Sequence, residues 1–324
     1  MKTCDICGTL NFKENNFCTH CGNKFIINHF CPFCGEINLN DATHCIKCNK
    51  QINPIYIDDF DILFSDYNHE LLLNAEITAE DYMNLLSNLF ARASYVEFNG
   101  RSLKDKILNF ASIFAECIPK SRGYERGSIF VGKYIFYDDR LEDSVQIATI
   151  IHELAHYFLF GIIESLLCDI FKVRSSPTLQ SFVWYFLTLP EFKIMNEYCA
   201  HTVEGRFIPF GYQNYGSFNS LVDADNFDAE SLNTMIVLGN SFANEIIIFL
   251  ENYIDEDLRE EIKIQYRKDS AIPNESSLLF ETSDSYDLSM KNSYLIKLLF
   301  SVFAEAPNRE VRKELERIKE DIIS

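Results

Sequence analysis

The chain has 324 residues, which is enough for two domains or for one large domain with a small module. Apolar residues make up 47% and charged residues 24%, a balance that excludes wholesale disorder. The formal net charge of −19 argues against a general DNA or RNA coat protein. No export signal opens the sequence, and the most apolar stretch, 147–171, contains three acidic residues that favour a buried core helix. We therefore expect a cytoplasmic protein with neither nucleic acid nor membrane as partner.

Eight of the eleven cysteines lie within the first 48 residues and form four regularly spaced CxxC pairs. Each pair can close a tight turn that points two thiolates at one centre, and two such turns complete a closed, structural zinc site. Glycine follows three of the pairs and Asn49 follows the fourth, where the turn needs a positive φ. The regular spacing favours metal-bound thiolates over disulfides. The predicted ligands of two structural zinc ions are Cys4, Cys7, Cys18, Cys21, Cys31, Cys34, Cys45 and Cys48.

This segment resembles the double zinc ribbon family, and Cys31-Pro32-Phe33-Cys34-Gly35 is close to the turn of that family. The resemblance covers about the first 50 residues and implies a small module that usually binds protein and sometimes nucleic acid. Residues 1–57 hold five lysines against four acidic residues, so the acidity belongs to the rest of the chain. Because the module lacks a basic surface, we expect it to contact protein or to regulate the rest of the chain. We predict the ribbon at 1–52, a linker at 53–75 and the main domain at 76–324.

The main domain is predicted to be mostly helical, with one clear strand. Thr78-x-x-Asp81 and Ser102-x-x-Asp105 each read as a capping box, and they predict helices that end near Ala93 and Ile118. Residues 128–137 are rich in β-branched and aromatic side chains and predict a strand. Further helices are predicted at 142–171, at 190–205, at 228–253 and, after a polar loop at 267–287, as two helices that finish the chain, the last from Asn308.

An HExxH motif, His152-Glu153-Leu154-Ala155-His156, lies inside the long apolar helix. Histidines four residues apart share one helical face, so both rings can reach one metal ion. Zinc lowers the pKa of a bound water, and Glu153 is placed to remove the proton of that water and pass it to the leaving amine. The motif occurs by chance in about one in a hundred chains of this size. The preceding strand and short turn complete the layout of a zincin, which supports the functional interpretation.

A second helix can supply the remaining ligand. Outside the motif, His201 is the only histidine beyond residue 70, and it follows Glu197 by four residues, so the two share a face. A catalytic zinc takes three protein ligands and leaves one position to water. Glu197 is favoured as the third ligand, with His201 behind it or stabilising an oxyanion; the rival assignment makes His201 the ligand, and Glu204 is a weaker candidate. Tyr212 and Tyr215, in the following Gly-rich loop, are weak candidates for oxyanion stabilisation.

Glu197-Tyr198-Cys199-Ala200-His201 resembles the E-x-x-A-[D/N] segment of the gluzincin metallopeptidases, including HtpX-like and ImmA/IrrE-like members. Glu197 and Ala200 match that pattern, while His201 replaces the usual Asp or Asn. The resemblance covers roughly residues 128–205. It implies His152, His156 and Glu197 as ligands of one catalytic zinc ion, with Glu153 and His201 as catalytic residues.

The sequence thus predicts an α+β, mostly helical zincin-like domain behind a small ribbon. The expected function is an intracellular zinc metalloendopeptidase that acts on a protein or peptide substrate. One alternative is a catalytically inactive adaptor in which ribbon and helical domain are binding surfaces. A second alternative, a nucleic-acid-associated ribbon protein, is disfavoured by the charge. Metal content separates the first two, because the enzyme should hold three zinc ions and the adaptor two.

Overall fold

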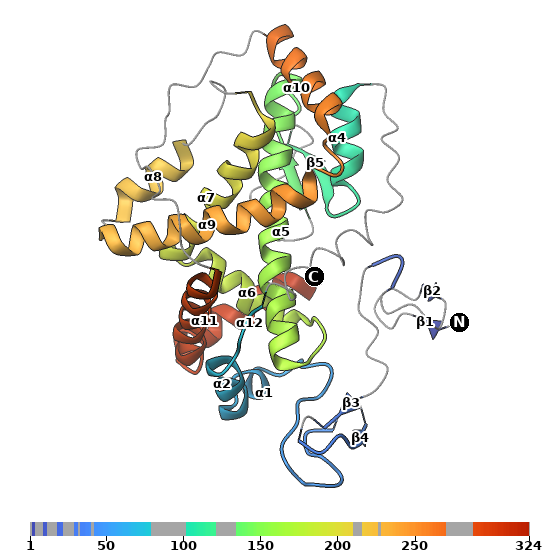
Figure 1. The fold of residues 1–324 in the computed structure, drawn as a ribbon, viewed down its shortest axis with the longest axis vertical. Helices are drawn as coiled ribbons and strands as arrows, with labels where there is room; N and C mark the ends of the chain where they lie inside the picture. The colour runs from blue at the N-terminus through green and yellow to red at the C-terminus, as the bar shows by residue number, and fades with distance from the viewer. Residues whose placement is uncertain are drawn as a thin grey trace. The chain divides into compact units, whose positions relative to one another are not determined.

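A computed structural model of the chain describes residues 2–3, 9–11, 18–21, 29–31, 33–39, 42–78, 102–120, 134–209, 216–225, 228–269 and 288–323. Over these ranges the protein is mostly helical with three small two-stranded sheets (Figure 1), as expected for a mostly helical α+β chain. The chain divides into two compact units. The first comprises 1–94, 162–186 and 287–324, and the second comprises 95–161 and 187–286. The predicted boundaries at residues 52 and 75 stay predictions.

The first unit begins with two short antiparallel hairpins. β1 (Lys2–Thr3) pairs with β2 (Leu10–Asn11), and β3 (His29–Phe30) pairs with β4 (Ile37–Asn38). Its helical elements are α1 (Phe60–Leu63), α2 (Asp66–Leu73), the end of α5 (Asp143–Phe171), α6 (Pro177–Thr188), α11 (Leu288–Glu305) and α12 (Arg309–Ile323).

Phenylalanine rings form the core of these helices. The ring of Phe303 on α11 lies 4.8 Å from that of Phe64, 5.3 Å from that of Phe182 and 5.5 Å from that of Phe171, measured between centroids. Such contacts bury large apolar surfaces in edge-to-face or tilted geometry. Residues 53–73 join this layer, since the Asn53 amide donates to the Asn68 side chain at 2.7 Å and to the Phe171 carbonyl at 2.9 Å.

The second unit holds the remaining helices and one parallel strand pair. β5 (Glu116–Pro119) pairs in parallel with β6 (Tyr134–Tyr137). The helices are the first part of α5, α4 (Leu103–Ala111), α7 (Pro190–Phe207), α8 (Gly216–Asp225), α9 (Ala229–Leu250) and α10 (Glu256–Lys268).

Most element predictions that fall on described residues are confirmed. The long helix begins at Asp143 and ends at Phe171 as expected, and the capping box at Ser102 is present, with Asp105 N donating to Ser102 Oγ at 3.1 Å. The predicted end of that helix near Ile118 is wrong: α4 stops at Ala111, because residues 116–119 are extended and pair as β5 with β6.

Five helices in the described part of the chain, α1, α2, α6, α8 and α10, were not predicted. The signal for α10 is present in the sequence, since Asp255 caps it and buried Leu258 and Ile262 follow at helical spacing. The predicted helix at 78–93, the first six residues of the strand at 128–137 and most of the loop at 267–287 lie outside the described residues.

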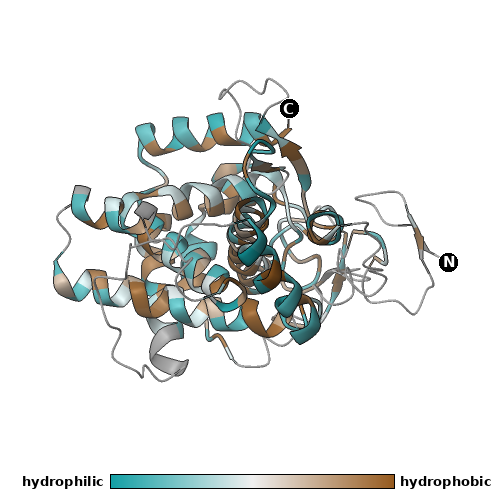
Figure 2. Cartoon of the chain, turned by 90° about the horizontal axis from the view of Figure 1, so that it is seen from above, coloured by the Kyte–Doolittle hydropathy of each residue, from teal (hydrophilic) through white to brown (hydrophobic). Residues whose placement is uncertain are grey.

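Two helices in the described part of the chain, α5 and α9, are long and apolar enough to cross a membrane. About half of each apolar window is buried inside the protein, and core helices of globular proteins meet the same criterion. The helices show polar and apolar sides along their length (Figure 2). The cytoplasmic location therefore stays a prediction.

α7 and α9 approach each other closely at Gly239. A Cβ atom at this position would lie 2.7 Å from the carbonyl oxygen of Met195 and 3.3 Å from the amide nitrogen of Cys199. Both atoms belong to the backbone of α7, so no side-chain rotation can relieve the clash. Gly239 therefore allows the backbones of α7 and α9 to touch at the turn of α7 that contains Glu197.

We expect Gly239→Ala to destabilise the protein by about 1–3 kcal/mol, because one of the two helices has to move. Gly161→Ala is the matched control: a Cβ there meets nothing within 4 Å, and alanine in a helix should stabilise by up to about 1 kcal/mol. Urea denaturation of the two variants measures both effects. Equal stability of the two variants would contradict the close contact.

Candidate functional site

The second unit brings five polar side chains of α5 and α7 into one cluster, which we call the histidine cluster: His152, His156, Glu197, His201 and Glu204. His152 and His156 follow each other by one turn of α5, and Glu197 and His201 do so on α7, so each helix presents one face to the other. Neighbouring residues on both helices are buried and apolar, including Leu154 and Ala200. The cluster is therefore a polar site enclosed by packed helices.

The Nε2 atoms of all three histidines face the Glu197 carboxylate. His152 Nε2 lies 3.1 Å from His156 Nε2 and 3.6 Å from Glu197 Oε2. His156 Nε2 lies 3.9 Å from Glu197 Oε1, and His201 Nε2 lies 4.0 Å from Glu197 Oε2. The carboxylate thus stands at the centre of the three rings.

The Nδ1 atoms of the same rings are held from outside. Glu204 Oε2 lies 3.1 Å from His152 Nδ1 and 3.3 Å from His201 Nδ1, and Asn196 Oδ1 lies 2.7 Å from His156 Nδ1. Carboxylate and amide oxygens only accept hydrogen bonds, so each Nδ1 carries the hydrogen. This arrangement frees each Nε2 lone pair in the neutral ring and aims it at the centre, as metal-ligating histidines require.

The two glutamates make the cluster strongly negative. Burial acts to raise the pKa of Glu197, but the hydrogen bond and charge of His152 and the charges of the other histidines lower it to about 2. Burial acts to raise the pKa of Glu204, but the hydrogen bonds and charges of His152 and His201 lower it. Burial lowers the pKa of His152, but hydrogen bonds and charges of both glutamates raise it to about 10. In the metal-free protein His152 is therefore protonated at neutral pH, and its positive charge balances part of the charge of the two carboxylates.

The donor set fits a zinc ion. Two donors that each lie about 2 Å from one ion can be no more than about 4 Å apart. Four of the six separations among the three Nε2 atoms and the Glu197 carboxylate lie between 3.1 and 4.0 Å and meet this limit. The set whose ligand atoms all lie within 4.8 Å of one another is His152, Glu197 and His201, and it does not include His156. A buried set of imidazole nitrogens and a carboxylate is the chemistry that zinc takes in proteins.

The structure thus brings together the predicted ligands and both rival third ligands. Glu197 and His201 each face the centre, whereas Glu204 binds the Nδ1 side of two rings. Glu153 is partly exposed next to the cluster, and its charge acts on His156. Sequence reasoning missed Asn196, although its place directly before Glu197 is a usable signal. Tyr212 and Tyr215 lie outside the described residues.

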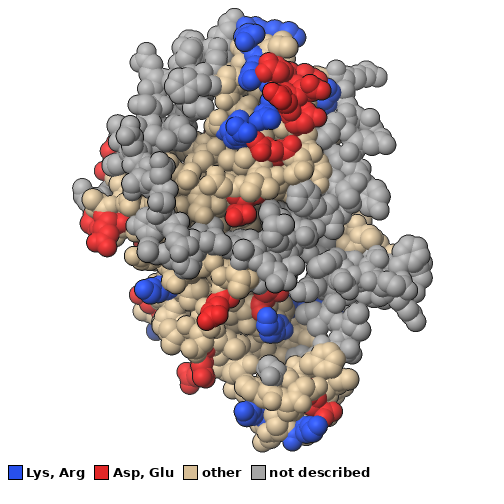
Figure 3. All heavy atoms as spheres, in the orientation of Figure 1, with Lys and Arg blue, Asp and Glu red and all other residues tan. Residues whose placement is uncertain are grey.

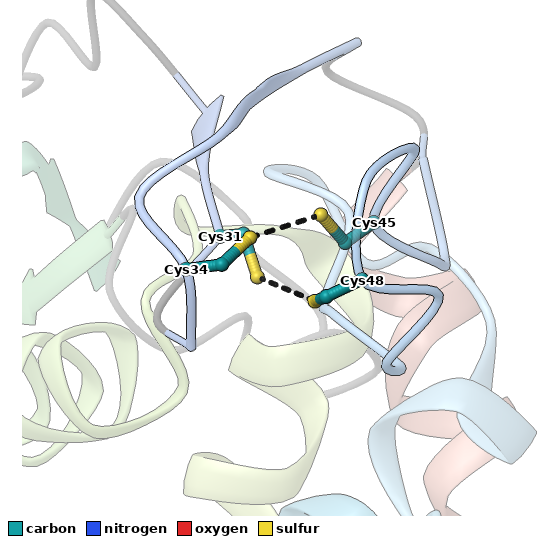
Figure 4. Close-up of side chains that lie close together, drawn as sticks. All are labelled: Cys31, Cys34, Cys45 and Cys48. Carbon is teal, nitrogen blue, oxygen red and sulfur yellow. Dashed lines mark hydrogen bonds between the residues drawn. The ribbon is translucent and has the colours of Figure 1, made fainter.

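A second candidate site is formed by four cysteines of the second predicted ribbon, Cys31, Cys34, Cys45 and Cys48 (Figure 4). The Sγ atoms of Cys31 and Cys48 lie 3.6 Å apart, as do those of Cys34 and Cys45. Gly35 and Asn49 have φ angles of 72° and 53°, and each amide donates to the carbonyl of the first cysteine of its pair. The predicted turns with positive φ are confirmed here.

The thiols of this cysteine cluster compete for charge when no metal is bound. A backbone hydrogen bond at Glu36 acts to lower the pKa of Cys34, but burial and the neighbouring sulfurs raise it to about 12. Burial acts to raise the pKa of Cys45, but backbone hydrogen bonds from Cys48 and Lys47 lower it to about 6. Four crowded sulfurs of this kind fit a divalent cation. Cys18 and Cys21 of the first ribbon are described and form no disulfide, while Cys4 and Cys7 lie outside the described residues.

Several of the described lysines and arginines form ion pairs with acidic side chains at the surface. On the face drawn in Figure 3, lysines and arginines of the described residues are interleaved with acidic side chains. Lys106 pairs with Glu261 at 2.8 Å, and Arg312 pairs with Asp61 at 2.8 Å.

No known protein family, curated protein or solved structure matches this chain.

We expect the purified protein to hold three zinc ions per chain, two in the ribbons and one in the histidine cluster. Replacing both Cys31 and Cys45 by serine should lower the count to two, since two thiolates cannot hold the ion. Cys168→Ser, which lies outside both clusters, is the control and should keep three. Elemental analysis of full-length protein measures the counts. Two ions in the wild-type chain would favour the adaptor.

Glu204→Gln should weaken metal binding at the histidine cluster by about 10- to 100-fold, because a neutral amide orients and polarises two imidazoles less well than a carboxylate. Glu191→Gln, an exposed position on the same helix, is the control. Competition with a chromophoric chelator measures the affinity. An unchanged affinity in Glu204→Gln would show that the carboxylate does not support the ligands.

Proposed function

We propose that the chain is a zinc metallopeptidase of zincin type with an N-terminal double zinc ribbon. The observation that supports this most is the convergence of three imidazole Nε2 atoms on one partly buried carboxylate, with Nδ1 of every ring held by an acceptor. The sequence places a glutamate, Glu153, directly after the first of these histidines. Ligands, outer support and a free carboxylate are the parts that hydrolysis by an activated water requires.

His152, His156 and Glu197 are the residues that would hold the catalytic ion. Zinc bound there supplies a Lewis acid that lowers the pKa of a water and polarises a carbonyl. Asn196 and Glu204 keep the rings oriented, so that little reorganisation is needed during the reaction.

Glu153 is the proposed general base. It removes a proton from the attacking water, and the resulting nucleophile forms a bond to the peptide carbonyl carbon. The carboxylic acid of Glu153 then gives the proton to the amine as the C–N bond breaks. The balance is one peptide bond and one water consumed, with one carboxylic acid and one amine formed.

The ribbon is proposed to recognise a protein, either the substrate or a regulator. The second ribbon exposes large apolar side chains to solvent, and such side chains often mark a protein-binding surface. Leu39 and Ile46 are each 74% exposed. The same observation supports the adaptor, a chain that binds protein through the ribbon and does not hydrolyse it. The experiment below separates the two.

The test is cleavage of a mixed synthetic peptide library by full-length protein, read by mass spectrometry. We expect zinc-dependent cleavage that a chelator stops. Glu153→Gln should lower turnover at least about 100-fold, the scale of a lost general base, while keeping three zinc ions. Glu142→Gln, an exposed residue just before α5, is the control and should retain activity.

Glu197→Ala should lose both turnover and one zinc ion, since it removes a ligand. Absence of cleavage in the zinc-loaded wild type, or full activity in Glu153→Gln, would contradict the peptidase and leave the adaptor.

A further inference from the structure

We propose that His201 is a fourth protein donor to the metal of the histidine cluster, so that the resting site is held by three imidazoles and one carboxylate. This inference rests on the metal-binding part of the proposed function and not on peptidase activity. It departs from the three-ligand set expected from the sequence, in which His201 stands behind the ligands or stabilises an oxyanion.

The first argument is distance. His201 Nε2 lies 4.0 Å from Glu197 Oε2, which is close to the 3.9 Å between His156 Nε2 and Glu197 Oε1. Its ring centroid lies 4.5 Å from that of His152, against 4.7 Å between the two motif histidines. The ligand atoms of His152, Glu197 and His201 also lie within 4.8 Å of one another, a group that does not include His156. By distance, His201 therefore qualifies as a ligand at least as well as the second motif histidine.

The second argument is the direction of the lone pair. His201 Nδ1 lies 3.3 Å from Glu204 Oε2, and the carboxylate can only accept, so Nδ1 carries the hydrogen. The neutral ring then has no hydrogen on Nε2 and offers a lone pair toward Glu197. A ring in this state binds a cation and cannot donate a hydrogen bond to an oxyanion. The geometry therefore favours the ligand role.

The third argument is that one carboxylate prepares two rings in the same way. Glu204 Oε2 accepts from Nδ1 of His152, a ligand by the motif, and from Nδ1 of His201. Both glutamate and His201 are buried, with 7% and 6% exposure, so the shared contact is enclosed. The shared contact turns the Nε2 atoms of both rings toward the Glu197 carboxylate, as two ligands of one ion require.

A fourth donor changes what the site does at rest. Four protein donors fill a tetrahedral site, the arrangement of closed, structural zinc centres. Water could take part only when one of the four donors yields its place.

The test is a ¹H–¹¹³Cd correlation spectrum of full-length wild-type protein loaded with ¹¹³Cd. Cadmium bound by nitrogen and oxygen resonates far from cadmium bound by thiolates, so the ribbons do not interfere. We expect one nitrogen-bound cadmium coupled to the ring protons of three histidines. Coupling to two histidines only would overturn the proposal, and this readout needs no variant to fold.

Two variants assign the rings. His201→Gln should leave two coupled rings, and the control His69→Gln, a histidine of α2 in the first unit, should leave three. Three coupled rings in His201→Gln would also overturn the proposal. A wild-type spectrum without any nitrogen-bound cadmium would instead remove the metal centre itself, and with it the proposed peptidase, so the two failures are distinguishable.

Discussion

The contact on which the candidate site depends is the buried pairing of His152 on α5 with Glu204 and Glu197 on α7. Each of these groups would be costly to bury alone, since an isolated charge in a packed interior loses its hydration. Together they compensate one another, and the compensation fixes which faces of the two helices meet. Removing one partner would leave the others buried without a counter-charge, so the cluster ties the identity of the site to the packing of the unit.

This pairing requires that α7 keep a constant position along its axis relative to α9, the other helix that it packs against. Gly239 allows the backbone of α9 to approach Met195 and Cys199, the residues two positions before and after Glu197. A helix that cannot slide presents Asn196, Glu197 and His201 at constant positions toward α5. The absent side chain of a glycine on one helix thereby contributes to ligand geometry on another, which is the rigid support that a preorganised site needs.

The sequence was informative wherever a single helix carries the pattern. The HExxH spacing, the length of α5 and the shared face of Glu197 and His201 all follow from a period of 3.6 residues. That period does not give the angle at which α7 crosses α5, so it could not say which carboxylate meets Nε2 and which meets Nδ1. The end of α4 was mispredicted for a similar reason. The segment after this helix forms β5, whose partner strand begins only at Tyr134, so the local sequence did not show it.

Charge gives the final reason to regard the cluster as a cation site. Glu197 and Glu204 contribute two negative charges at neutral pH, and the raised pKa of His152 returns one positive charge in the metal-free protein. The group then keeps a net negative charge in a buried place. A divalent cation that displaced the proton would bring the sum to zero. An ion that bound only the folded arrangement would also stabilise the packing of α5 on α7.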